Sequence, residues 1–448
     1  MAESLETLTA ALLDAARDAG ADSADALAIE GSSIGIDVRE GRLEQAERSE
    51  GIDIGLRVLI GRQQACVSAS DTKPATLREM AERVVAMARE APEDSYIGLA
   101  DPGRVARDRD AAALELADPA DEPSPAALET DARAAEAAAL EVTGVSQVQS
   151  ASAGYGRQAL HIAATNGFSG GYARTSRNVS CVAITGEGTA MERDYHAEGR
   201  TFQADLPDPA WVGRLAGERA AARAGARRPR TGAFPVLYDE RIAGSLINHL
   251  LAAVNGTAIA RGSSWLRDAL GEAVLPAGLS LVEEPHRPRV SGSRPFDAEG
   301  LATARREIVG AGRLRGWTLD LTTGRKLGMD STANAARGPA APPAPSAGNV
   351  RLTQGSSSRD DLIAEMGTGL LVTSLIGSSI NPTTGDYSRG ASGFWVENGE
   401  IVHPVNECTI AGNLRDMLMR LTPANDAREH LSHVVPSLLV EGLTIAGE

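Results

Sequence analysis

The hydrophobic positions in the first part of the chain follow two spacings. Near the amino terminus, and again from Pro74 to Glu90, apolar residues recur every three or four positions, which predicts amphipathic helices. Between these segments, residues 34–38 and 52–58 are apolar at every second position, as in strands with one buried face. We therefore expect antiparallel strands joined by glycine-containing turns and flanked by helices.

The same succession returns further along the chain. An acidic, alanine-rich stretch from 101 to 125 indicates a connection, and a helix is expected through Ala132 to Leu140. Strand patterns then run from Val145 to Thr201, and a helix follows from Trp211 to Arg227. The order helix, strands, helix thus occurs twice, which indicates an internal duplication that has left no residue-level repeat.

The pattern changes after residue 230. The segment "FPVLYD" predicts a short buried strand, and beyond Gly271 the chain is rich in glycine and strand-like, with few long helices. We predict an α+β fold, with a mixed helix and antiparallel-sheet domain over 1–230 and a mainly antiparallel β domain over 231–448. The stretch "RRPRTGA" is the expected boundary.

Charge and cysteine content narrow the function classes. The 448 residues include 60 acidic and 44 basic side chains, and the resulting formal charge of −16 repels nucleic acids and anionic lipid surfaces alike. The three cysteines lie far apart, so neither a disulfide framework nor a Cys-x-x-Cys metal site is indicated. Apolar runs are too short for a membrane helix. We expect a cytoplasmic protein that binds neither nucleic acid nor membranes.

The usual catalytic patterns are missing. None of the seven histidines is followed by glutamate, so the His-Glu-x-x-His helix of zinc peptidases is absent. No serine lies in a Gly-x-Ser-x-Gly turn, and no phosphate-binding glycine loop joins a strand to a helix. Asp297 and Glu299 in "RPFDAEG" would share one face of a strand as an acid and base pair, although a structural turn is the preferred interpretation.

One apolar helix attracts attention because it carries a single histidine. In "DERIAGSLINHLLAAVNG", Asp239 is the expected N-cap and Gly256 the expected residue after the helix. Apolar residues cover about half of its circumference. The opposite face is small or amide-bearing, which favours close approach of a partner chain or a peptide; its residues are Gly244, Ser245, Asn248, Ala252 and Asn255. His249 lies at the border between the two faces.

Several segments together resemble the TldD/PmbA metalloprotease family, and specifically its PmbA (TldE) branch. They include "VLYDERIAGSLINHLLAAVNGTAIARGSSWLRD", "RPFDAEG", "GRKLGMDSTANAAR", "GTGLLVTSLIGSSINPTTGDYSRGASGFWVENGEIVHPV", "TIAGNLRDML" and, in the first half, "MERDYHAEGR". The resemblance implies a cytoplasmic protease system of two related chains. The TldD-type chain supplies a His-Glu-x-x-x-His helix and a cysteine as ligands of a zinc-type metal, and the assembly degrades unfolded or peptide-like substrates and matures peptide precursors.

The metal motif is degenerate in this chain. Aligned on Gly244, the first ligand position of the family falls on Asn248, the glutamate on His249 and the second ligand on Ala253. Near the family's cysteine this chain has Leu414. Asparagine is a poor zinc ligand and alanine is none. The resemblance therefore implies no metal and no catalytic residue in this chain.

Three hypotheses follow. The first is a metal-free subunit that completes the substrate cavity of a TldD-type catalytic partner. The second is a homodimer that binds peptides or regulates proteins without catalysis. The third, ranked last, is an independent hydrolase that uses Asp297, Glu299 or His249.

Overall fold

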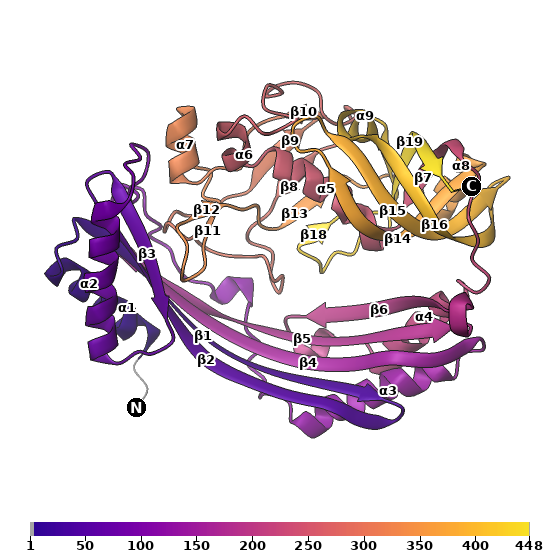
Figure 1. Ribbon diagram of the computed structural model, residues 1–448, viewed down its shortest axis with the longest axis horizontal. Helices are drawn as coiled ribbons and strands as arrows, with labels where there is room; N and C mark the ends of the chain where they lie inside the picture. The colour runs from indigo at the N-terminus through magenta and orange to yellow at the C-terminus, as the bar shows by residue number, and fades with distance from the viewer. Residues whose placement is uncertain (1–3, 448) are drawn as a thin grey trace.

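A long six-stranded antiparallel sheet forms the amino-terminal half of the protein. The computed structural model describes residues 4–447, and the strand order in this sheet is β3-β2-β1-β4-β5-β6. The strands are β1 (Ser23–Arg39), β2 (Arg42–Ile60), β3 (Gln63–Ala69), β4 (Val145–Ala164), β5 (Ser169–Thr185) and β6 (Glu192–Arg200). Four of them are much longer than ordinary strands, and they curve beneath the rest of the molecule (Figure 1).

Four helices cover one face of this sheet. They are α1 (Leu5–Asp18), α2 (Pro74–Glu90), α3 (Pro125–Leu140) and α4 (Pro209–Ala221). Ala26 and Ala28 of β1 pack against α1 and α2, whereas Ile34 and Ile36 pack against α3 and α4. These positions are all even-numbered, so both helix pairs lie on the same face of β1.

The predicted order of elements is present twice in this half. Each copy consists of a helix, three antiparallel strands and a helix, and the sheet order is symmetric about the β1–β4 pair. Helix α2 has the predicted bounds, whereas α4 ends at Ala221, before the predicted Arg227.

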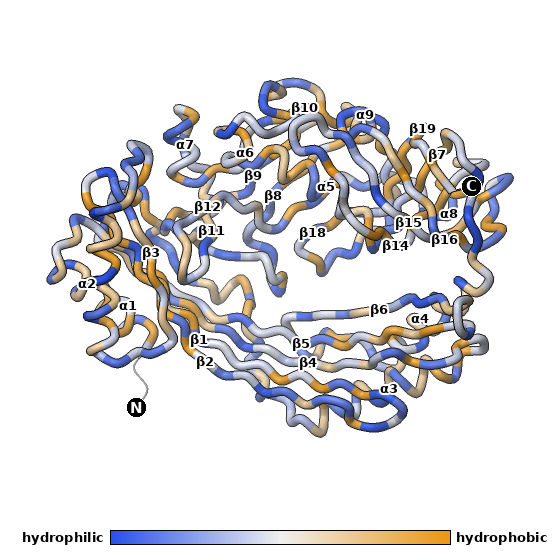
Figure 2. Tube along the Cα trace, viewed as in Figure 1, coloured by the Kyte–Doolittle hydropathy of each residue, from blue (hydrophilic) through white to orange (hydrophobic). Residues whose placement is uncertain are grey.

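The carboxy-terminal half is rich in strands and contains a closed barrel. Its barrel strands are β7 (Gly232–Tyr238), β14 (Gly369–Ile380), β15 (Asp386–Glu397), β16 (Glu400–Asn413) and β19 (Leu438–Ala446). Because β16 pairs with both β15 and β19, the sheet closes on itself, and β17 (Leu421–Pro423) adds to β19. Figure 2 shows hydrophobic and hydrophilic positions mixed along the chain in this half.

Smaller elements surround the barrel. A second sheet has the order β10-β9-β8-β13-β18, built from β8 (Leu281–Glu283), β9 (Arg306–Gly310), β10 (Arg313–Leu314), β13 (Val350–Leu352) and β18 (His433–Val434). A short pair joins β11 (Ala335–Ala336) and β12 (Ala344–Pro345). The helices of this half are α5 (Glu240–Ala253), α6 (Gly256–Ala260), α7 (Leu321–Leu327), α8 (Arg359–Met366) and α9 (Leu414–Met419). The predicted α+β fold is confirmed.

The two halves meet on the face of the sheet that α1–α4 leave free (Figure 1). Leu27 and Phe168 from the sheet share a buried apolar cluster with Phe296 from the carboxy-terminal half, and the rings of Phe168 and Phe296 lie 5.0 Å apart.

Among the described residues, no helix has the length and apolar content that crossing a membrane requires.

Candidate functional site

Helix α5 begins directly after the barrel strand β7. Asp239 is its N-cap, as predicted, and its carboxylate accepts a hydrogen bond from the backbone N–H of Arg241 at 3.2 Å. The Arg241 guanidinium also contacts Asp239 and donates to Asp194 of β6 at 2.9 Å. All three side chains are buried, so this ion cluster ties the start of α5 to the amino-terminal sheet.

The apolar face of α5 packs as its periodicity predicts. Leu246, Ile247 and Leu250 are fully buried in the main core cluster of the carboxy-terminal half. That cluster also contains Leu414 of α9, the residue near the family's cysteine position. The fold therefore brings Ala253 and Leu414, two distant positions that the resemblance compares with the family's metal ligands, into one core, and neither side chain carries a metal-binding atom.

The three motif positions differ in environment. Asn248 is exposed, His249 is half-buried and Ala253 is buried. The structure contains no group of three or more His, Cys, Asp or Glu side chains that could hold a metal within the residues it describes. Cys408 is no substitute, because its buried thiol donates to the carbonyl oxygen of Ala391 and burial raises its pKa to about 11. The donor set at this helix does not fit a zinc-type ion.

His249 packs edge-on against the ring of Tyr387, with the ring centroids 5.9 Å apart. Burial, together with the positive charge of Arg389, lowers the pKa of His249, so the imidazole is neutral near pH 7. Its Nε2 atom and the Ser245 hydroxyl, one helical turn away, are buried without a hydrogen-bond partner among the described residues. Both atoms lie inside the packed structure, so they are not open to a molecule that approaches α5 from outside.

The small face of α5 is only partly free. Asn248 and Ala252 are exposed, and Gly244 has no atom within 4 Å of the position where a Cβ would stand. Asn255, by contrast, caps α6 by accepting from Thr257 N–H at 2.9 Å and donates to the Pro345 carbonyl at 2.8 Å. Asn255 therefore belongs to the internal structure rather than to an open face.

The predicted end of this helix was wrong. Gly256 does not follow α5 as a left-handed residue; Val254 is the C-cap, and Gly256 is the buried first residue of α6. A Cβ at Gly256 would stand 2.6 Å from Thr323 Oγ1, so close packing explains the glycine.

Asp297 and Glu299 lie in a turn, which was the preferred interpretation. The Asp297 carboxylate accepts backbone hydrogen bonds from Glu299, Leu301 and Ala335 at 2.9–3.0 Å. Glu299 accepts from Leu321 N–H at 2.8 Å, and both carboxyl groups are buried. Because both carboxyl groups are closed off from solvent, nothing in this arrangement supports an acid and base pair open to substrate.

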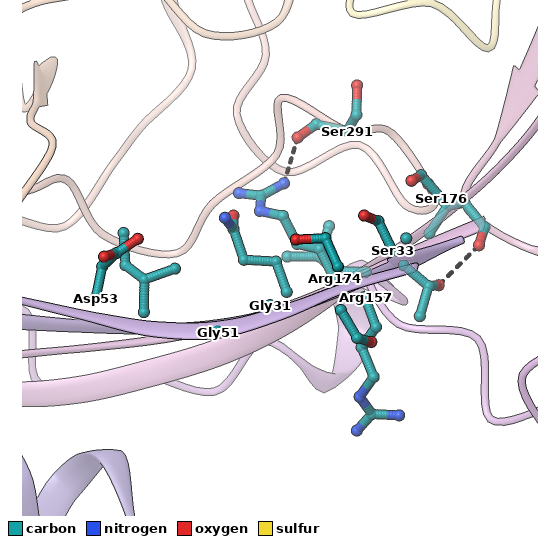
Figure 3. A pocket seen from close by; sticks show the side chains of 16 residues that line it. Gly31, Ser33, Gly51, Asp53, Arg157, Arg174, Ser176 and Ser291 are labelled. Atoms are coloured by element: carbon teal, nitrogen blue, oxygen red, sulfur yellow. Dashed lines mark hydrogen bonds between the residues drawn. The ribbon is translucent and has the colours of Figure 1, made fainter. Parts of the chain in front are cut away.

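A hollow of about 500 Å³ lies on the sheet face that points toward the carboxy-terminal half. Figure 3 shows it above the middle of the strands. Its floor consists of small residues that align across three strands, β2, β1 and β4: Gly31 is opposite Gly51, and Ser33 is opposite both Ser49 and Gly156. Arg174 lies beside this floor and donates to the carbonyl oxygen of Ser291 (Figure 3). It also donates to the carbonyl oxygen of Ser293.

Sequence reasoning missed this hollow. Its glycines and serines are visible in "EGSSIG" and "RSEG", but only the strand register places them side by side. The lining offers serine hydroxyl groups and the Asp53 carboxylate, which suit a polar, extended ligand such as a peptide. The Arg157 guanidinium points away from the hollow, toward the other face of the sheet (Figure 3).

Family models cover most of the chain. Models described as PmbA/TldA metallopeptidase domain 1, central domain and C-terminal domain match residues 24–88, 118–224 and 231–447. The chain belongs to the PmbA/TldA metallopeptidase family. The family resemblance of the sequence motifs is thereby confirmed.

Members of this family are similar over almost the whole length. Metalloprotease PmbA of Escherichia coli O157:H7 is 34% identical over 95% of this chain and 93% of its own. A Metalloprotease PmbA homolog of Haemophilus influenzae is 35% identical over 97% of this chain and 94% of its own.

Solved structures agree with the fold. A Bacteroides thetaiotaomicron protein, described as a proposed modulator of DNA gyrase, superposes with a TM-score of 0.90 at 28% identity and covers 98% of both chains. TldE of Thermococcus kodakarensis superposes with a TM-score of 0.85 at 19% identity over 98% of this chain and 100% of its own, and that likeness concerns the fold alone.

Proposed function

We propose that this chain is a non-catalytic PmbA/TldE-type subunit of a two-chain metalloprotease. A TldD-type partner supplies the zinc-type metal, and this chain completes the cavity that encloses a peptide or an unfolded segment. The observation that carries the proposal is the donor set of α5, where Asn248 is exposed and Ala253 is buried at the positions that the family resemblance assigns to metal ligands. The three cysteines are unpaired, in keeping with a reducing cytoplasm as its location.

The role of the chain is then to bind and to orient. The small face permits close approach of the partner or of an extended peptide, because Asn248 and Ala252 are exposed and the half-buried Gly244 leaves open space where a Cβ would stand. Ser245 and His249 do not take part in this contact, because their unpaired polar atoms are buried.

The test combines metal analysis with a peptidase assay. The pure chain should contain no stoichiometric zinc and should not cleave an unstructured peptide. Activity should arise when a TldD-type chain is added and should disappear with a chelator. Zinc-independent cleavage by the lone chain would overturn the proposal, and loss of such cleavage in His249→Ala would favour the independent hydrolase.

A bulky residue on the small face of α5 tests whether this face is needed for the partner-dependent activity. Ala252→Trp should reduce the partner-dependent activity at least tenfold without lowering the melting temperature, because Ala252 is exposed and the new ring fills the approach path. Ala10→Trp, at an exposed position of α1, is the matched control and should leave the activity unchanged. Equal activity of both variants would remove the small face from the proposal.

The hollow on the sheet favours a second candidate, a metal-independent homodimer that binds peptides or regulates proteins. Its volume of about 500 Å³ lies within the range of small-ligand sites. Fluorescence anisotropy of a labelled unstructured peptide with the lone chain separates the two: micromolar binding without the TldD-type partner favours the second candidate.

A further inference from the structure

The outer edge of β2 has no neighbouring strand over half of its length. β3 pairs with β2 only from Ile54 to Ile60, so residues 45–53 pair with β1 alone. Residues 42–51 are exposed on both faces of the sheet. In the part of the chain that the structure describes, no hydrogen bond from outside β1 reaches the backbone of 45–53.

Two local features define the ends of this free edge. At one end the β1–β2 register shifts between the pairs of Asp37 and Val38, which leaves Glu44 as an extra residue, a bulge that breaks the ladder. At the other end β3 begins to pair at Ile54. The segment between them contains no proline and keeps an unbroken register with β1, so its free N–H and C=O groups form a regular template for another strand.

The charges on this segment favour one particular pairing with a second copy of the same segment. Two identical strands that pair antiparallel about a two-fold axis place one residue opposite itself. An axis at Glu47, Arg48 or Glu50 would oppose like charges, which is destabilising. An axis at Ser49 instead places Arg48 opposite Glu50 of the second copy, twice by symmetry.

The Ser49 register also fits the remaining positions. Ser49 lies at the middle of the free segment 45–53, so the pairing uses all of it. Ala46 then faces Ile52, and Glu47 faces Gly51, with no like charges opposed. In the single chain Arg48 contacts Glu50 at 2.7 Å and also Glu122, exposed contacts that exchange at little cost.

We propose that the free edge of β2 joins two copies of this chain into a homodimer through antiparallel pairing centred on Ser49, which makes one continuous sheet of both amino-terminal halves. Ser49, Gly51 and Asp53 also line the hollow on the sheet, so the pairing places the two hollows next to each other across the axis. This interface goes beyond the proposed function, because it forms between copies of the pure chain whether or not a catalytic partner is present.

Charge-swap variants test the pairing. Analytical ultracentrifugation of the pure wild-type chain should show a dimer that weakens with salt, because exposed ion pairs are screened. Arg48→Glu and Glu50→Arg should each raise the dissociation constant at least tenfold, since each opposes like charges at two places. An equimolar mixture of the two variants should restore the dimer, and so should the double variant R48E/E50R.

The matched control is Glu47→Arg, an equally large charge change on the same strand. Its predicted opposite residue is Gly51, so the dimer should persist. A monomeric wild type at tens of micromolar, single swaps that dimerise like the wild type, or a mixture that stays monomeric would each overturn the proposal.

A cross-link provides a second, independent readout. Residues directly opposite in an antiparallel pair lie about 4.5–5.5 Å apart at Cα, a separation that a disulfide spans. Ser49→Cys should form a covalent dimer under mild oxidation, whereas Glu47→Cys should not. Cross-linking of Glu47→Cys alone would place the axis elsewhere and contradict the Ser49 register.

Discussion

The carboxyl group of Glu299 lies where the carboxy-terminal half packs on the sheet. One oxygen accepts from Leu321 N–H, while the other is buried without a partner among the described residues. Burial, with smaller contributions from the charges of Asp297 and Asp320, raises the pKa of Glu299 to about 8. The carboxyl group is therefore protonated in the folded protein near pH 7.

This raised pKa has a defined effect on stability. Between the unfolded value of about 4.3 and the folded value of about 8, the folded state binds a proton that the unfolded state lacks. The free energy of unfolding therefore falls as the pH rises through this range and levels off above it. Glu299→Gln removes this dependence, so its melting temperature relative to the wild type should rise by a few degrees from pH 5 to pH 9.

Differential scanning calorimetry at several pH values measures the difference. Glu93→Gln, at an exposed position, is the control and should track the wild type at every pH. A constant offset between Glu299→Gln and the wild type would mean that Glu299 is ionised in the folded protein.

At the scale of elements, the two glycines in and just after α5 differ in how closely they are packed. Gly244 is a helical glycine with open space around its missing Cβ, so Gly244→Ala should stabilise the chain by about 0.5–1 kcal/mol through helix propensity. Gly256 is packed against Thr318, Leu319 and Thr323, so Gly256→Ala should cost about 1–3 kcal/mol through overpacking. Urea denaturation measures both changes.

The Gly244→Ala variant also tests whether the small face of α5 binds the partner. If the small face receives the partner, Gly244→Ala should weaken partner-dependent activity while it stabilises the chain. A destabilised Gly244→Ala would show that the helix is not open at this position.

Periodicity predicts elements well wherever one face of an element is buried. Helix α2 has its predicted bounds because Pro74 opens it and its stripe from Leu77 to Ala88 is regular. The end of α5 could not be predicted, because the contact that makes Gly256 a packing residue comes from Thr323, distant in sequence. For the same reason the small residues of the hollow stay unrecognised until strand register aligns them.

In the whole molecule, the two halves are joined by buried charges as well as apolar contacts. Asp25 of β1 accepts from Arg57 of β2 at 2.7 Å and pairs with Arg337 from the carboxy-terminal half. All three side chains are almost fully buried. Burial lowers the pKa of Arg57 and lowers that of Arg337 to about 10. Guanidinium groups stay charged in proteins, so both depend on the Asp25 carboxylate for compensation.

Asp25→Asn should therefore destabilise the protein strongly. It leaves two buried guanidinium groups beside a neutral amide, and loss of one partner in a buried pair costs about 3–5 kcal/mol. Asp14→Asn breaks the exposed Asp14–Arg17 pair of α1, 2.9 Å long, and should change the stability by less than about 0.5 kcal/mol. Urea denaturation compares the two, and hydrogen exchange should rise around Arg337 only in Asp25→Asn. Equal stabilities would show that the sheet and the carboxy-terminal half hold together through the Phe168–Phe296 cluster without help from these charges.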